Sequence, residues 1–210
     1  MSVEIDLALL RSLPLPALAS DTDKDARGRV MVVGGGAEVP GAALLAAVAA
    51  LRVGAGKLQM AATAAFAQCL ALAVPEARVI TVEGEGDISP DAAPALIEAA
   101  GRCDGVVVGP GMMDEGPAGQ LAARLLEGAP HTAFVLDAAA MTAMGDHARA
   151  ARAAGRLVLT PHPGEMAALS GRSKEEVQAD PVAVARDMAA KFQAVVTLKS
   201  RDTWIVSPDG

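Results

Sequence analysis

The sequence predicts an α/β protein in which helices cover both faces of a largely parallel sheet. Stretches with strand character alternate with helical patterns along the chain, and this alternation is typical of α/β folds. Most of the strand-like stretches are continuous apolar runs, as expected for strands buried on both faces. The 210 residues are 52% hydrophobic and only 2% aromatic, so Ala, Val and Leu must fill the core. We expect a single domain over residues 1–210.

The expected elements follow a lead-in arm, residues 1–28, which holds one short amphipathic piece, two prolines and a charged run. Glycines and prolines mark the boundaries. Residues 34–36 follow the first strand, residues 54–56 stop the first helix, and Pro90 opens a helix that Ser89 caps. The expected strands are residues 29–33, 57–62, 78–82, 105–108, 134–136, 157–160, 194–198 and 203–206. The expected helices are residues 42–53, 64–73, 91–100, 117–126, 165–169 and 174–191, with short helical pieces over residues 141–154.

The last two strands are expected to form a hairpin around residues 200–202. Residues 208–210, Pro-Asp-Gly, have the composition of a further turn. Because the pattern stops in the middle of this turn, we expect the native domain to continue beyond Gly210. The domain over residues 1–210 would then lack its C-terminal segment.

Composition excludes several classes of protein. The net charge of −7 and the isoelectric point of about 4.9 argue against a general nucleic-acid binder, which normally has a basic face. The apolar run at residues 41–51 is too short to span a bilayer, and the N-terminus has no signal-peptide pattern. We therefore expect a soluble, cytoplasmic protein without a membrane partner. Cys69 and Cys103 belong to no CxxC motif, and we expect two buried free thiols.

A stiff turn follows the strand that begins at Leu157, in the sequence Thr-Pro-His-Pro-Gly-Glu at residues 160–165. Its two prolines fix φ and remove two backbone donors. Glu165 falls in the first turn of the next helix, where the helix dipole favours a carboxylate. Parallel sheets bind ligands where strands end in front of helices, so His162 is a candidate site residue. It has no partner at metal-ligand spacing, and we do not expect a zinc site.

Two glycine-rich loops follow the first and fourth strands, at residues 34–41 and 109–111. The first could cradle an anion at the start of a helix, or it could be a plain turn. It is not a dinucleotide-binding fingerprint, because Val39 stands where the third glycine belongs. In the second loop, Gly109 and Gly111 could let a ligand approach the backbone, or they could serve a tight turn.

Polar residues end two further strands. Asp137 could cap a helix, hold a metal-water cluster or bind a ligand hydroxyl. Lys199 and the residues after it could hold a phosphate or nucleotide, or form an exposed hairpin tip. The carboxyl ends of parallel strands lie on one edge of a sheet, so these residues and the glycine loops should converge there. That convergence is a stronger indication of a site than any one motif.

In this order the motifs resemble the ADP/ATP-dependent NAD(P)H-hydrate dehydratase family, the C-terminal half of YjeF-type proteins. The resemblance covers nearly the whole chain from about Lys24. Its most specific parts are residues 109–111 and 160–165. The other matching parts are residues 28–36, 40–43, 50–56, 75–76, 136–138 and 198–203. The family has a ribokinase-like fold, which implies a three-layer α/β/α sandwich with a mostly parallel central sheet.

The resemblance implies a lyase that repairs hydrated nicotinamide cofactors. ADP or ATP would phosphorylate the C6 hydroxyl of the 6S epimer of NADHX or NADPHX. Loss of phosphate would then restore NAD(P)H, with Mg²⁺ screening the phosphates. The family also implies a homo-oligomer, often a tetramer. Carried over by motif, the hydrate-binding positions are Ala42, Gly109, Gly111, Asp137 and His162, and the nucleotide-binding positions are Lys199, Ser200, Arg201, Asp202 and Thr203.

The chain departs from the family pattern at three places. Ala139 replaces the second Asp of the family's Leu-Asp-Ala-Asp-Ala-Leu, and Asp23 replaces the usual His before Lys24. The family's Gly-Ser-Gly-Asp segment would lie beyond Gly210. That segment supplies an anion hole and the Asp that acts as the general base, so residues 1–210 contain no identified base.

Two other functions remain open from the sequence. One is a kinase of the same fold that acts on a sugar or a vitamin precursor, which would accumulate a stable phosphate ester instead of releasing free phosphate. The other is a nucleotide-binding module without catalysis, in keeping with the missing base and with Ala139. It would bind nucleotide without turnover.

Overall fold

An eight-stranded sheet forms the centre of the computed structural model, which describes residues 3–13, 15, 23–142 and 155–209. Over these residues the strand order is β3-β2-β1-β4-β5-β6-β7-β8. Neighbouring strands are parallel except β7 and β8, which pair antiparallel and form the predicted hairpin. The strands are β1 Arg29–Val33, β2 Lys57–Thr63, β3 Ala77–Val82, β4 Gly105–Val108, β5 Ala133–Leu136, β6 Leu157–Leu159, β7 Val195–Leu198 and β8 Trp204–Val206.

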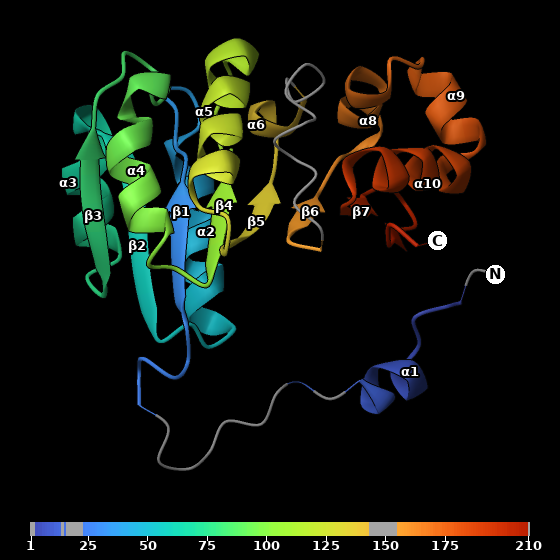
Figure 1. Ribbon diagram of the computed structural model, residues 1–210, viewed down its shortest axis with the longest axis horizontal. Helices are drawn as coiled ribbons and strands as arrows, with labels where there is room; N and C mark the ends of the chain where they lie inside the picture. The colour runs from blue at the N-terminus through green and yellow to red at the C-terminus, as the bar shows by residue number, and fades with distance from the viewer. Residues whose placement is uncertain (1–2, 14, 16–22, 143–154, 210) are drawn as a thin grey trace.

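Helices lie on both faces of this sheet (Figure 1). Helices α2 (Pro40–Arg52) and α3 (Ala64–Ala73) share one apolar core with β1 and β2. A larger core joins the opposite face to helices that include α4 and α5. The helices in addition to α2 and α3 are α1 Leu7–Ser12, α4 Ala93–Ala100, α5 Glu115–Gly128, α6 Ala139–Thr142, α8 Pro163–Ser170, α9 Lys174–Ala179 and α10 Pro181–Phe192, and a 3₁₀ turn, η1, spans Pro90–Ala92. The predicted α/β/α layering is confirmed.

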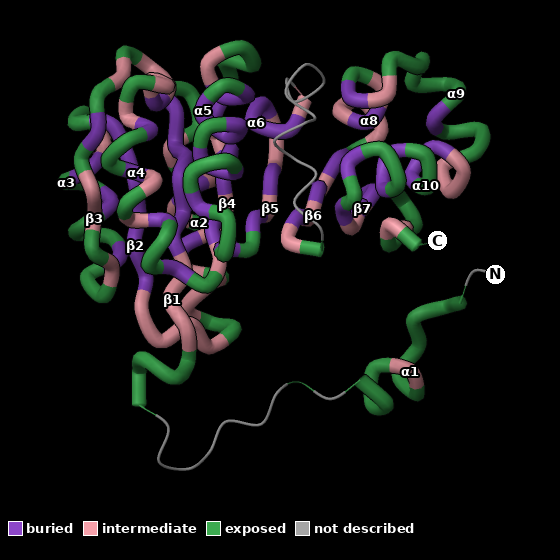
Figure 2. Tube along the Cα trace, viewed as in Figure 1, coloured by how far each residue is buried: buried purple, intermediate pink, exposed green. Residues whose placement is uncertain are grey.

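The central strands are buried on both faces, as their continuous apolar sequences predict. In β1, Met31 and Val33 belong to the larger core and Val32 to the other, and all three are fully buried. Figure 2 shows the same arrangement, with buried strands inside and exposed residues on the outer helices. Small side chains such as Ala43 and Ala47 let α2 pack closely on the sheet.

The prediction of one long helix over residues 174–191 is wrong. Two helices, α9 and α10, occupy this stretch and meet at Asp180. Pro181 cannot donate a backbone hydrogen bond and would clash with the preceding turn, so it begins a new helix. The Asp180 carboxylate caps α10 by accepting from the Ala183 amide at 3.1 Å.

The lead-in arm contains the predicted short helix, α1, none of whose residues is buried. It lies apart from the sheet in Figure 1. Of the helical pieces predicted over residues 141–154, Met141 and Thr142 belong to α6, and residues 143–154 lie outside the described residues. No helix of the described chain is long and apolar enough to cross a membrane.

Both cysteines are free thiols, as predicted, but only one is buried. Cys69 lies on the exposed side of α3, so the prediction of a buried thiol there is wrong. Burial raises the pKa of the Cys103 thiol, whose sulfur also accepts from the Gln59 amide at 3.3 Å. At pH 8 Cys103 should therefore remain a thiol, and the thiolate is the reactive form.

We expect a disulfide reagent at pH 8 to modify Cys69 quickly in the folded protein and Cys103 only after unfolding. Thiol titration by absorbance, with and without denaturant, measures both classes. In a Cys69→Ser variant the fast phase should disappear. Two fast thiols in the native protein would contradict the assignment.

Candidate active site

The predicted site residues lie at the carboxyl ends of the parallel strands. Residues 34–36 follow β1, residues 109–111 follow β4, and Asp137 follows β5. Thr160 follows β6, and Lys199 follows β7. The parallel pairing from β1 through β7 places all of these ends along one edge of the sheet. We call this edge the site rim.

The two glycine loops contact each other directly. The Gly35 amide donates to the Pro110 carbonyl at 2.8 Å, and the Gly36 amide donates to the Gly111 carbonyl at 2.9 Å. A methyl group on Gly34 would lie 2.5 Å from the Pro110 oxygen. The close backbone approach that these glycines permit is therefore, in this structure, the approach of one loop to the other.

Gly109 and Gly111 have further reasons to be glycine. Both have positive φ, +113° and +77°, where other residues are strained. A Cβ on Gly109 would overlap the Asp137 carbonyl oxygen, and one on Gly111 would overlap that of Val39. Ala42, in the first turn of α2, also lies against Gly111. Two predicted hydrate-binding positions, Ala42 and Gly111, are thus neighbours at the contact between the loops.

Asp137 lies at the centre of a polar cluster on the site rim. Its Oδ1 accepts from Thr160 Oγ1 at 2.7 Å and from Lys199 Nζ at 3.0 Å. Among the described residues, no donor lies within hydrogen-bond distance of its other oxygen, Oδ2. The carboxylate is therefore oriented from one side and can accept a ligand donor on the other. The cluster joins three strands, since Asp137, Thr160 and Lys199 follow β5, β6 and β7.

The backbone next to Asp137 is unusual. Ala138 has φ of +48°, a left-handed conformation that costs free energy in a residue other than glycine. Ala139, which stands where the family has a second Asp, is buried in the core with 7% of its surface exposed. In this chain that position therefore packs into the protein interior and adds no polar group to the site rim.

His162 caps helix α8 as well as lying on the site rim. Its Nδ1 accepts from the amides of Gly164 at 3.0 Å and Glu165 at 3.2 Å. Glu165 completes a capping box, because its Oε2 accepts from the His162 amide at 2.7 Å. Since Nδ1 acts as an acceptor, the neutral imidazole carries its proton on Nε2. Glu165 Oε1 lies 3.5 Å from Nε2, but the His162 side chain is 58% exposed, so a ligand can reach this N–H from solvent.

The predicted nucleotide-binding residues do not all lie together: Lys199 contacts Asp137, whereas residues 200–203 line two hollows. Lys199 points back to Asp137, and its amide donates to the Pro161 carbonyl at 2.7 Å. Arg201, Asp202 and Thr203 border a hollow that also contacts residues 3–5 of the arm. Ser200, Arg201 and Asp202 line another hollow of about 270 Å³, to which Thr203 does not contribute.

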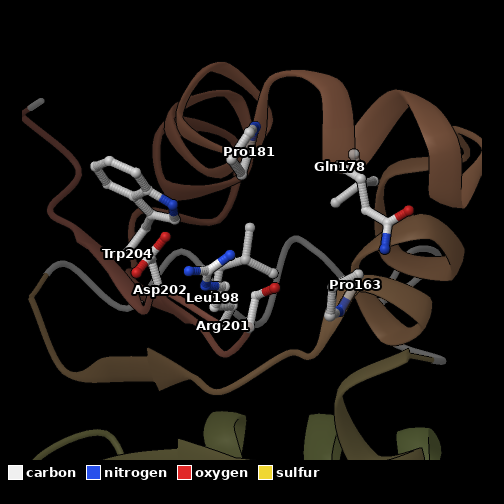
Figure 3. A pocket seen from close by; sticks show the side chains of 9 residues that line it. Pro163, Gln178, Pro181, Leu198, Arg201, Asp202 and Trp204 are labelled. Carbon is white, nitrogen blue, oxygen red and sulfur yellow. The ribbon is translucent and has the colours of Figure 1, made fainter.

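The hollow lined by Ser200 combines apolar walls with polar groups (Figure 3). Arg201 and Asp202 lie beside Trp204 on one side, Pro181 lies above them, and Gln178 and Pro163 lie on the other side. Leu198 and Val177 complete the lining. Flat apolar surfaces with a few polar groups suit a heterocyclic base with its sugar.

Sequence reasoning missed two residues that shape the site rim. Trp204 lines the hollow. It is the only tryptophan of the chain, and that is the one sequence feature that could have marked it as a candidate. Asp87, in the loop after β3, accepts from the amides of Met113 and Asp114. In the sequence, Asp87 stands out only as part of an acidic, glycine-rich loop. That composition does not predict a contact with a residue 26 positions away.

Replacing Gly111 by Ala should destabilise the protein by about 1–3 kcal/mol, because the methyl group meets the Val39 carbonyl at a positive φ. Urea unfolding measures the difference. The matched control is Gly116→Ala in α5, where a Cβ meets open space, and we expect it to be neutral or stabilising by up to about 1 kcal/mol. Equal stability of the two variants would contradict the loop packing.

Known proteins match this chain over most of its length. The sequence profile described as NAD(P)H-hydrate dehydratase matches residues 30–210. An ADP-dependent (S)-NAD(P)H-hydrate dehydratase of Xanthomonas campestris is 45% identical over 209 residues, which cover 98% of this chain and 69% of the relative. A bifunctional NAD(P)H-hydrate repair enzyme of Moorella thermoacetica is 36% identical, and the match covers 93% of this chain and 37% of that enzyme.

Solved structures show the same fold. The ADP/ATP-dependent NAD(P)H-hydrate dehydratase of Bacillus subtilis, co-crystallised with ATP and Mg²⁺, superposes with a TM-score of 0.77 at 28% identity, over 97% of this chain and 68% of that one. A ribokinase-like superfamily protein of Enterococcus faecalis gives a TM-score of 0.75 at 24% identity, over 91% of this chain and 64% of its own. The predicted ribokinase-like fold is confirmed, and the chain belongs to the NAD(P)H-hydrate dehydratase family.

Proposed function

We propose that this protein is a lyase that uses ADP or ATP to dehydrate the 6S epimer of NADHX or NADPHX and so restores NAD(P)H. The observation that carries the proposal is the cluster of Asp137, Thr160 and Lys199. It lies on the site rim with the glycine loops on one side and the hollow beside Trp204 on the other. Relatives named as ADP-dependent (S)-NAD(P)H-hydrate dehydratases support it.

The proposed reaction needs a hydroxyl and a phosphoryl group side by side. The hydrated ring would lie beside Ala42, Gly109 and Gly111, with its C6 hydroxyl toward Asp137 Oδ2 and the Nε2–H of His162. The nucleotide would occupy the hollow lined by Ser200, Arg201 and Asp202, with Thr203 beside it. Lys199 would then lie between the two ligands.

Lys199 is the group that stabilises phosphoryl transfer in this proposal. Its ammonium can stabilise the negative charge that develops on the phosphate during transfer. The C6–O bond then breaks with release of phosphate, and loss of a proton from C5 to water forms the C5=C6 double bond of the dihydropyridine. The hydroxyl must also lose its proton, and the family resemblance assigns that role to the Asp of the Gly-Ser-Gly-Asp segment. We therefore keep the family's Gly-Ser-Gly-Asp segment as the proposed source of the base.

Mg²⁺ would screen the phosphates. The described residues contain no group of three His, Cys, Asp or Glu that could hold an ion by themselves. Mg²⁺ commonly binds nucleotide phosphates together with one or two carboxylates and water. Since Asp137 Oδ2 is assigned to the C6 hydroxyl, the nucleotide phosphates and water would supply the Mg²⁺ ligands here.

We also propose a cytoplasmic homo-oligomer, a tetramer by family resemblance. Free thiols are typical of a reducing compartment. Large apolar side chains are exposed on the outer helices, and they offer surfaces on which copies can pack. These residues are Leu45 on α2, Val53 at its end and Leu72 on α3.

Recovery of NADPH absorbance from NADPHX, with ADP or ATP and Mg²⁺, tests the function. We expect recovery that depends on nucleotide and releases free phosphate. Two proteins should be assayed side by side, residues 1–210 and the uninterrupted reading frame. Activity in both would place the base within residues 1–210, and activity in the longer protein alone would place it outside.

The matched pair for this assay is Lys199→Ala and Lys174→Ala. The first should lower kcat by about 100-fold or more, as loss of a preorganised charge-stabilising group does. The second removes an exposed lysine at the start of α9 and should change nothing. A stable phosphate ester of another substrate would support a kinase, and nucleotide binding without turnover in the longer protein would overturn the proposal.

Two substitutions separate the capping role of His162 from its proposed role in substrate binding. His162→Asn keeps an N-cap acceptor but removes Nε2, so it should raise the KM for the hydrate while stability stays within about 0.5 kcal/mol of wild type. His162→Ala should raise the same KM and also destabilise the protein by about 0.5–2 kcal/mol. Unchanged kinetics in both variants would remove His162 from the site.

A further inference from the structure

We propose that Asp87 is a positioning residue that fixes the geometry of the hydrate-binding loops, an inference that rests on the proposed function. Asp87 lies in the loop between β3 and η1 and does not belong to any strand or helix. Its carboxylate lies against Gly36 in the first glycine loop and accepts from two amides that follow the second. We call this set of contacts the Asp87 clasp.

The first half of the clasp fixes the loop after β4. Asp87 Oδ2 accepts from the amides of Met113 and Asp114, each at 2.7 Å. These two residues directly follow residues 109–112 and lead into α5. Asp114 is the N-cap of α5, yet its own side chain makes no capping hydrogen bond. Asp87 thus supplies, from another loop, the negative partner that the start of a helix favours.

The second half of the clasp fixes the loop after β1. The Asp87 carboxylate lies directly against Gly36, where a Cβ would overlap its Oδ1. The Gly36 amide donates to Gly111, and the next amide, that of Ala37, donates to the Gly86 carbonyl at 3.1 Å. One carboxylate therefore links the loop that leads to Ala42 to the residues that follow the Gly111 loop, and it reinforces the direct hydrogen bonds between the loops.

The clasp is not needed to anchor its own loop. Ile88, the next residue, is 1% exposed and packs in the larger core. The Ser89 amide donates to the Glu83 carbonyl at 3.0 Å, and the Ser89 side chain caps η1. Asp87 itself is only half-buried. Its charge-assisted hydrogen bonds therefore act mainly on the site rim.

Steady-state kinetics of the full-length chain with NADPHX and nucleotide test the clasp. Asp87→Ala should raise the KM for the hydrate about tenfold, equivalent to about 1.4 kcal/mol. The KM for nucleotide should stay within about twofold, because the nucleotide residues follow β7 and do not touch Asp87. Asp87→Asn keeps one carbonyl oxygen as acceptor and should recover most of the loss. Glu85→Ala, a neighbouring exposed carboxylate, is the matched control and should behave as wild type.

Hydrogen–deuterium exchange tests the clasp without any catalysis. The amides of Met113 and Asp114 should exchange faster in Asp87→Ala than in wild type or Glu85→Ala, with the melting temperature nearly unchanged. Unchanged exchange at both amides would overturn the clasp, whatever the enzyme's activity. Faster exchange with an unchanged hydrate KM would overturn its positioning role. Wild-type protein that shows the expected exchange but no turnover of the hydrate would instead count against the proposed function.

Discussion

The parallel pairing of β1 with β4 is the constraint on which the site depends. The chain builds β1, β2 and β3 outward in one direction and then returns to place β4 on the other side of β1. The loops that follow β1 and β4 therefore leave the sheet as neighbours, at the point where the strand order reverses. Open α/β sheets bind ligands at such points. Here the two loops are glycine-rich, and they hydrogen-bond directly to each other.

Much of this arrangement could be predicted from the sequence because it depends on local patterns. Continuous apolar runs identified the strands, and glycines and prolines identified their ends. Parallel strands share an edge, so the placement of Asp137, Thr160 and Lys199 on one edge followed from the predicted parallel sheet. That these residues follow three adjacent strands did not, because the strand order could not be predicted. The direct contact of Lys199 with Asp137 did not follow, because it depends on side-chain rotamers across 62 residues.

Other features could not be predicted because distant parts of the chain determine them. The glycine loops could have opened to a ligand or closed on each other, and only the β1–β4 register decides between the two. Residues 174–191 have a helical pattern throughout, but Pro181 divides them. The division has a consequence for the site, since Val177 before it and Pro181 after it both line the hollow with Leu198 and Trp204. The sequence did not show that His162 caps the helix that follows it, where its Nδ1 accepts two backbone hydrogen bonds.

The ion pair between Lys199 and Asp137 has a consequence for the order of events at the site. With no ligand bound, each charge has the other as its partner. A phosphate that binds Lys199 must compete with Asp137 for the ammonium, and in doing so it leaves the carboxylate with Thr160 as its donor and a better acceptor for the hydroxyl at Oδ2. By the same reasoning, a hydroxyl that donates to Asp137 weakens the Lys199–Asp137 ion pair, and Lys199 can then bind a phosphate more readily. Thermodynamic linkage requires these two effects to be equal, so each ligand raises the affinity of the site for the other.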